Sequence, residues 1–169
     1  VSTDSERIAQ ISRNCGADVP FIRPKELAED HVFDFPVVEH CLNYLEKEEC
    51  WIPDILIFLR PTMPLRKPKE IVKCLQLLKS RPDIDCVRTT CPVPYPPYWM
   101  KKITNNGLLV PFCEDVLSYQ YNRFQDLPET VMCDGYVDIS RVSSIRKYKQ
   151  VVAGKILSSY RKNQFQVDL

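Results

Sequence analysis

Residues 54–66 read DILIFLRPTMPLR, and this stretch decides the fold class of the 169-residue chain. Its apolar beginning predicts a buried strand. Pro61 and Pro64 then hold the backbone extended, and each removes a backbone donor. Arg60 and Arg66 are therefore expected on a stiff turn at the carboxyl end of a strand, where open α/β sheets bind their ligands. Two interpretations remain open: a turn that holds an anion, or a proline-stiffened loop with solvated arginines.

Helical and strand patterns alternate on both sides of this stretch. Helices are expected after the capping residue Ser5 and up to Gly16, over residues 37–49, after Pro68 up to residue 78, and over residues 142–148. Strands are expected over residues 17–21, 54–59, 86–91, 135–139 and 156–160. This βαβ alternation predicts a mostly parallel sheet with helices on both faces, in the α/β class.

The second half contains a hairpin signal. Residues 98–103 and 108–112 flank Asn105-Asn106-Gly107, a turn sequence that favours a two-stranded hairpin. Hairpins of this size are marginal alone, so an arm over about residues 93–130 needs a covering surface, and a second copy of the chain is the simplest one. Four aromatic side chains suit such a dimer interface, although packing on the core is an alternative. They are Tyr95, Tyr98, Trp99 and Phe112.

Composition excludes several classes of protein. The chain is 44% apolar and 27% charged, as a globular domain is, and its net charge of +1 gives no case for a nucleic-acid partner. No apolar run reaches membrane-spanning length, and the first residues do not resemble a signal peptide, so a cytoplasmic protein without membrane contact is expected. The eight cysteines include no C-x-x-C and accompany only two histidines. This pattern indicates buried thiols rather than a zinc site.

Five segments, in order, resemble one enzyme family. The chain resembles the acylneuraminate cytidylyltransferases (CMP-sialic acid synthetases) and their bacterial nonulosonate relatives. The segments are VSTDS at 1–5 with Ile8-Ala9, Gly16-Ala17 with Arg23-Pro24 and LAED at 27–30, LRPTMPLR at 59–66, PYWMK at 97–101, and QDLP at 125–128 before Gly135.

The resemblance implies a Rossmann-like domain that transfers CMP from CTP to the anomeric hydroxyl of a sialic-acid-like (nonulosonate) sugar acid and releases pyrophosphate. It also implies a homodimer that exchanges the arm, and Mg²⁺ that bridges the phosphates. Guanidinium groups match carboxylates bidentately, which suits the implied sugar-acid site. The residues that the resemblance places at the substrate are Arg23, Asp30, Arg60, Thr62, Arg66, Arg123, Gln125 and Asp134.

The chain also departs from the family pattern. Neither the basic phosphate loop, roughly R-x-x-S-K-G, nor the D-x-D metal pair is found, so residues 1–169 are expected to be one cytidylyltransferase-like domain, incomplete at both ends. The sequence therefore identifies no catalytic residue and no metal ligand. Arg60 replaces a glutamine, Phe124 and Met132 stand where arginines are usual, Asp134 replaces an asparagine, and Asp34 falls where a serine is common. Two hypotheses follow: a cytidylyltransferase for an altered sugar acid, or a catalytically inactive binding or dimerisation module.

Overall fold

The structure is a computed structural model that describes residues 1–112 and 123–162. The helices are α1 (Glu6–Asn14), α2 (Asp34–Glu48), α3 (Pro68–Ser80) and α4 (Val142–Tyr148), with single 3₁₀ turns η1 (Lys25–Leu27), η2 (Pro97–Trp99) and η4 (Phe124–Asp126). The strands are β1 (Ile55–Phe58), β2 (Cys86–Pro92), β3 (Lys101–Ile103), β4 (Leu109–Pro111), β5 (Val131–Arg141) and β6 (Ile156–Tyr160).

Local chemistry explains where the helices begin. The Ser5 hydroxyl accepts a hydrogen bond from the Ile8 amide at 3.4 Å and caps α1, as predicted. Pro68 occupies the first turn of α3, where its missing N–H costs nothing. The strand predicted over residues 17–21 is wrong, because this segment is irregular and pairs with no strand. Pro20 lacks the amide that a ladder needs, and the Val19 carbonyl accepts from the Arg13 guanidinium instead.

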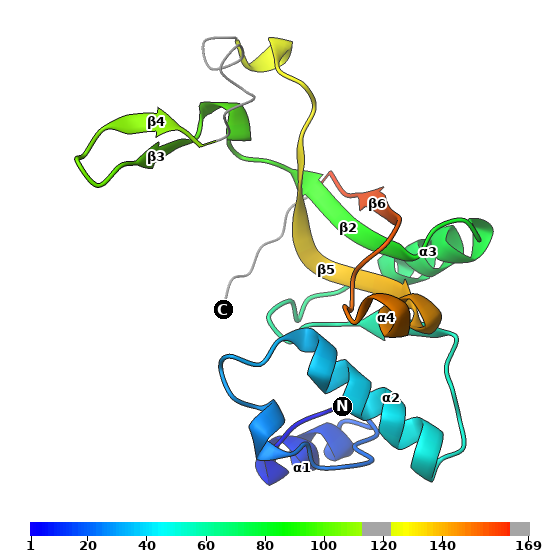
Figure 1. Ribbon diagram of the computed structural model, residues 1–169. Helices are drawn as coiled ribbons and strands as arrows, with labels where there is room; N and C mark the ends of the chain where they lie inside the picture. Colours follow the sequence, from blue (N-terminus) through cyan, green and yellow to red (C-terminus); the bar gives the residue numbers. More distant parts are fainter. Residues whose placement is uncertain (113–122, 163–169) are drawn as a thin grey trace.

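The main sheet has four strands in the order β1-β5-β2-β6 (Figure 1). β2 and β6 are parallel, but β5 lies between β1 and β2 and is antiparallel to both. The sheet is therefore mixed, and the prediction of a mostly parallel sheet is wrong for its central strand. The chain between β2 and β5 carries the hairpin β3–β4, and an antiparallel neighbour, unlike a parallel one, does not require a crossover helix.

Helices cover both faces of this sheet, as the alternation predicted. On one face, Cys74 and Leu78 of α3 are fully buried against Val137 and Ile139 of β5. On the other face, α2 and α4 pack with the alternate side chains of β1 in a second cluster that contains Leu42. Side chains two residues apart in a strand point to the same face, so Val137 and Ile139 both join the cluster that packs against α3. The stretch 136–140 of the central strand is thereby shielded from water.

A two-stranded hairpin, β3 with β4, extends away from the main sheet (Figure 1). Its turn contains Gly107 at a φ of +80°, a conformation that glycine adopts without strain. Ile103 is 73% exposed and Leu109 is 69% exposed. None of the four predicted interface aromatics belongs to either core cluster of the described residues. Residues 113–122 of the expected arm lie outside the described residues, and its role in dimerisation stays a prediction.

Two further observations concern the sequence predictions. Cys74, Cys86 and Cys91 are buried, and burial raises the pKa of the Cys86 thiol to about 11, so this side chain is a protonated, unreactive hydrophobe. Among the helices that the structure describes, none is long and apolar enough to cross a membrane.

Candidate functional site

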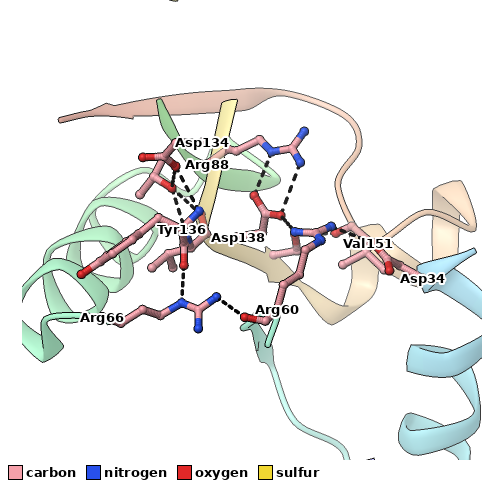
Figure 2. A network of polar contacts seen from close by, with 11 residues as sticks. Asp34, Arg60, Arg66, Arg88, Asp134, Tyr136, Asp138 and Val151 are labelled. Carbon is pink, nitrogen blue, oxygen red and sulfur yellow. Dashed lines mark hydrogen bonds and ion pairs between the residues drawn. The ribbon is translucent and has the colours of Figure 1, made fainter. Parts of the chain in front are cut away.

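A fully buried carboxylate, Asp138, organises the polar centre of the sheet (Figure 2). Phe58 of β1 and Arg88 of β2 both lie opposite Asp138 in the strand register. Arg60, which follows β1, donates from Nη1 to Asp138 Oδ2 at 2.5 Å, and Arg88 donates from Nε to Asp138 Oδ1 at 2.8 Å. Two guanidinium groups thus neutralise and satisfy one carboxylate that has no access to water.

Arg60 has a second carboxylate partner. Its Nη2 donates to Asp34 Oδ2 at 2.7 Å, and Asp34 is the first residue of α2. Burial works to lower the pKa of the Arg60 guanidinium, but the hydrogen bonds to Asp138 and Asp34 outweigh it, so the pKa lies above its ordinary value. The guanidinium also lies 4.7 Å from the centre of the Phe58 ring. Arg60 therefore joins α2 to the sheet and is fully paired.

Arg66 is bound differently. Its Nε donates to the Tyr136 carbonyl at 2.6 Å, and its Nη2 donates to the Arg60 carbonyl at 2.6 Å. No ion pair joins Arg66 to a carboxylate of residues 1–112 or 123–162. Burial is the main cause that lowers the pKa of the Arg66 guanidinium. We call Arg60, Arg66 and Arg88 the arginine cluster; with Asp34 and Asp138 it carries one excess positive charge, and Arg66 holds the unpaired one.

Tyr136 holds the loop that carries Arg66. Besides the carbonyl bond to Arg66, its hydroxyl accepts from the Lys67 amide and lies 3.5 Å from the Leu65 carbonyl. The guanidinium of Arg161 stacks on its ring at 3.5 Å from the ring centre. Tyr136 itself is buried, so its contacts fix the backbone of the loop against β5.

Asp134 is also neutralised from within the chain. Its Oδ2 accepts from Arg161 Nη1 at 2.7 Å, and its Oδ1 accepts from the Thr89 hydroxyl at 2.5 Å and from the Tyr136 amide at 3.0 Å. The Asp134 side chain is 4% exposed. This geometry removes the repulsion that a bare carboxylate would exert on an anionic ligand.

The structure places the predicted site residues in separate groups. Arg66 and Asp134 both contact Tyr136, the Arg60 carbonyl accepts a hydrogen bond from Arg66, and Thr62 is exposed on the loop between the two arginines. Within the described ranges, the four other predicted residues form no hydrogen bond or ion pair with the arginine cluster. Arg23 lies 3.7 Å from Asp4, Asp30 is exposed, Arg123 pairs with Asp126 at 2.8 Å, and Gln125 is exposed on η4.

Sequence reasoning missed Arg88 and Asp138. Arg88 lies in a strand whose other residues are mostly buried, and Asp138 lies in the buried stretch 136–140 of β5, between Val137 and Ile139. A charged residue within an apolar strand was the available signal, because such residues are rarely buried unless they are paired. The sequence did not show which strands are neighbours, so the partner of each charge could not be named.

The described residues do not fit a magnesium site. No group of three His, Cys, Asp or Glu side chains that could hold a metal ion occurs within residues 1–112 and 123–162. Both oxygens of Asp138 and both oxygens of Asp134 are engaged by arginine or hydroxyl donors. Magnesium prefers free carboxylate oxygens and water, and neither carboxylate has a free oxygen to offer.

No protein-family model matches the chain. Two curated proteins are similar to it over 110 residues, which are 65% of this chain and 46% of each relative. One is the CMP-N,N′-diacetyllegionaminic acid synthase of Legionella pneumophila, at 32% identity. The other is the post-translational flagellin modification protein B of Campylobacter coli, at 35% identity. The chain thus matches about half the length of these relatives.

A solved structure shares the fold. It is a CMP:2-keto-3-deoxy-manno-octonic acid synthetase complexed with CTP, and the likeness covers 99% of this chain and 74% of that one, with a TM-score of 0.63 at 15% identity. At this identity the likeness concerns the fold alone. The similarity to the two curated proteins confirms the resemblance that the sequence motifs indicated, and the solved structure agrees with it in fold: the chain is similar to CMP-sugar acid synthetases and consistent with a divergent acylneuraminate cytidylyltransferase-like protein.

Proposed function

We propose that the protein transfers CMP from CTP to a nonulosonate sugar acid. In this reaction the anomeric hydroxyl oxygen bonds to the α-phosphorus, the bond from that phosphorus to the bridging oxygen breaks, and pyrophosphate leaves. The observation that carries the proposal is the one positive charge in the arginine cluster that no carboxylate of the described residues neutralises, that of Arg66. It lies on the loop that follows β1, and a relative with 32% identity is named as a CMP-sugar acid synthase.

The contacts around Arg66 suit an anion-binding role. Its two hydrogen bonds go to carbonyl oxygens, so the remaining N–H groups and the charge stay available to a ligand. Tyr136 fixes the loop backbone before a ligand arrives, which lowers the entropy cost of ordering the site on binding. A guanidinium in this position recognises a carboxylate or phosphate in a fixed orientation.

The proposal also extends to the other predicted site residues. Thr62 lies on the same loop, and Asp134 helps to hold Tyr136 by accepting a hydrogen bond from its backbone amide. We propose that Arg23, Asp30, Arg123 and Gln125 reach the substrate from the outer elements η1 and η4 and from their flanks. Magnesium would accompany CTP through the phosphate oxygens and neutralise their charge. The described residues supply no ligand set for it, so no step of the proposal depends on a metal bound by them.

The reaction is tested by incubating the protein with CTP, MgCl₂ and a panel of keto sugar acids that includes N,N′-diacetyllegionaminic acid and N-acetylneuraminic acid. Release of pyrophosphate together with formation of a CMP-sugar is the expected result. Arg66→Ala should reduce binding of the sugar acid by more than tenfold, because a charge-assisted hydrogen bond contributes about 1.5–3 kcal/mol. Arg81→Ala, at an exposed arginine beyond α3, is the matched control and should leave binding unchanged.

An inactive binding or dimerisation module is the alternative. The observation that favours it is the full pairing of Arg60, Asp134 and Asp138 within the chain, which leaves these groups little capacity for chemistry. Two results together would support the inactive module: no pyrophosphate is released with any sugar acid, and CTP does not raise the melting temperature of the protein.

We propose further that the protein is a homodimer joined through the hairpin. Ile103 and Leu109 expose apolar side chains on opposite strands of an element that touches little of its own domain, and apolar exposure of this kind marks interaction surfaces. Sedimentation velocity should give a dimer at micromolar concentration. Ile103→Glu combined with Leu109→Glu should give a monomer with an unchanged melting temperature, and a wild-type monomer would refute the proposal.

A further inference from the structure

The two carboxylates that bind Arg60 differ in how easily they can leave. Asp138 is completely buried and also pairs with Arg88, so its departure would leave the Arg88 guanidinium without this carboxylate partner. Asp34 is 49% exposed, comes from a different element, and Arg60 is its single ion-pair partner among the described residues. Its contact is a surface ion pair, and such pairs contribute little free energy and exchange readily with solvent.

We propose that Asp34 is an intramolecular substitute for the carboxylate of the ligand. In the ligand-free protein Asp34 neutralises the outer Nη2 of Arg60; when a sugar acid binds, its carboxylate takes this place and Asp34 turns to water. The inference rests on the proposed function, because it assigns the ligand carboxylate to Arg60 Nη2. Asp34 then determines specificity, since an anion must compete with a tethered carboxylate before it can bind.

The charges make this exchange feasible. One carboxylate replaces another at the same guanidinium, so the arginine cluster keeps its single excess positive charge throughout. The inner end of Arg60 stays fixed by Asp138, and its carbonyl stays bonded to Arg66 Nη2, so the guanidinium does not have to move.

The test compares wild-type protein with Asp34→Asn and Asp34→Ser, neither of which carries a competing charge. Binding of N-acetylneuraminate, of its uncharged methyl ester and of inorganic phosphate is measured by calorimetry, and the Arg60 side-chain NMR signal reports where the ligand lies. Both variants should bind N-acetylneuraminate about two- to fivefold more tightly than wild type, the factor that corresponds to a surface ion pair. The Arg60 signal should shift with the acid, and binding of the ester should not tighten.

Asp83→Asn is the matched control, because Asp83 also pairs with an arginine at 2.8 Å and is similarly exposed, but at the far end of α3. The proposal is overturned by unchanged affinity in both Asp34 variants, by equal tightening in Asp83→Asn, by tightening for phosphate and not for the acid, or by an absence of acid binding in every variant. Pyrophosphate release from CTP reports separately on the transfer reaction. Transfer without tighter binding refutes the role of Asp34 alone, and tighter acid binding without transfer refutes the enzyme alone.

Discussion

Asp138→Asn should be among the most destabilising single changes in this protein. The substitution keeps the shape of the side chain but removes the charge that Arg60 and Arg88 share. Two short charge-assisted hydrogen bonds are weakened, at 2.5 and 2.8 Å, and each is worth about 1.5–3 kcal/mol. The third contact, from Arg88 Nη2 at 3.5 Å, is at the limit for a hydrogen bond and adds nothing to this figure.

Removal of one partner from a buried ion pair typically costs about 3–5 kcal/mol, in agreement with this sum. Both arginine side chains are 28% exposed, so water relieves part of the penalty and the lower end, about 3 kcal/mol, is expected. Urea unfolding followed by circular dichroism measures the effect. With a denaturant dependence of about 2 kcal/mol per molar, the unfolding midpoint should fall by roughly 1.5 M.

The controls separate burial of the ion pair from the loss of any aspartate. Asp83→Asn removes a carboxylate from an equally short but exposed ion pair, and its midpoint should stay close to that of the wild type. A midpoint shift below about 0.5 M for Asp138→Asn would refute the reasoning, because it would mean that Asp138 is not the buried counter-charge of two guanidinium groups.

Three further predictions concern the rest of the molecule. Gly154→Ala should lower the melting temperature clearly more than Gly107→Ala. Both glycines have a positive φ, +74° and +80°, but only the new Cβ at position 154 would clash with a neighbour, the carboxylate of Asp85. Hydrogen bonds from the Ser144 hydroxyl and the Lys155 amide lower the pKa of the Asp85 carboxyl below its ordinary value of 3.8. The Asp85 carboxylate therefore stabilises the fold above pH about 4, and this contribution is lost as the pH falls further. Asp85→Asn should reduce the loss of stability at acid pH, as melting curves recorded at several pH values would show. Iodoacetamide at pH 8 should alkylate the exposed Cys133 in the native protein and leave the buried Cys86 unmodified until urea is added, as mass spectrometry would show.

Most individual elements could be predicted from the sequence, because their signals are local. The Ser5 cap, the position of Pro68 and the apolar period of α2 depend on residues within a few positions of one another, and all three helices form as expected. The strand that was expected over residues 17–21 does not form, because Pro20 lacks a backbone amide and because no strand of the described residues lies beside this segment to pair with it.

The sequence by itself determined the helices, the approximate positions of the six strands that the structure describes, the family resemblance and the stiff loop that carries Arg60 and Arg66. Only the tertiary structure decided that β5 runs against its neighbours and that Asp138, fifty residues beyond Arg88, lies between two arginines. Helix caps and turns are fixed by contacts along the chain, whereas the partner of a charge is fixed by strand order. For that reason the sequence left open whether the two arginines of this loop hold an anion, and the structure shows that two carboxylates already pair with Arg60 and that no carboxylate of the described residues pairs with Arg66.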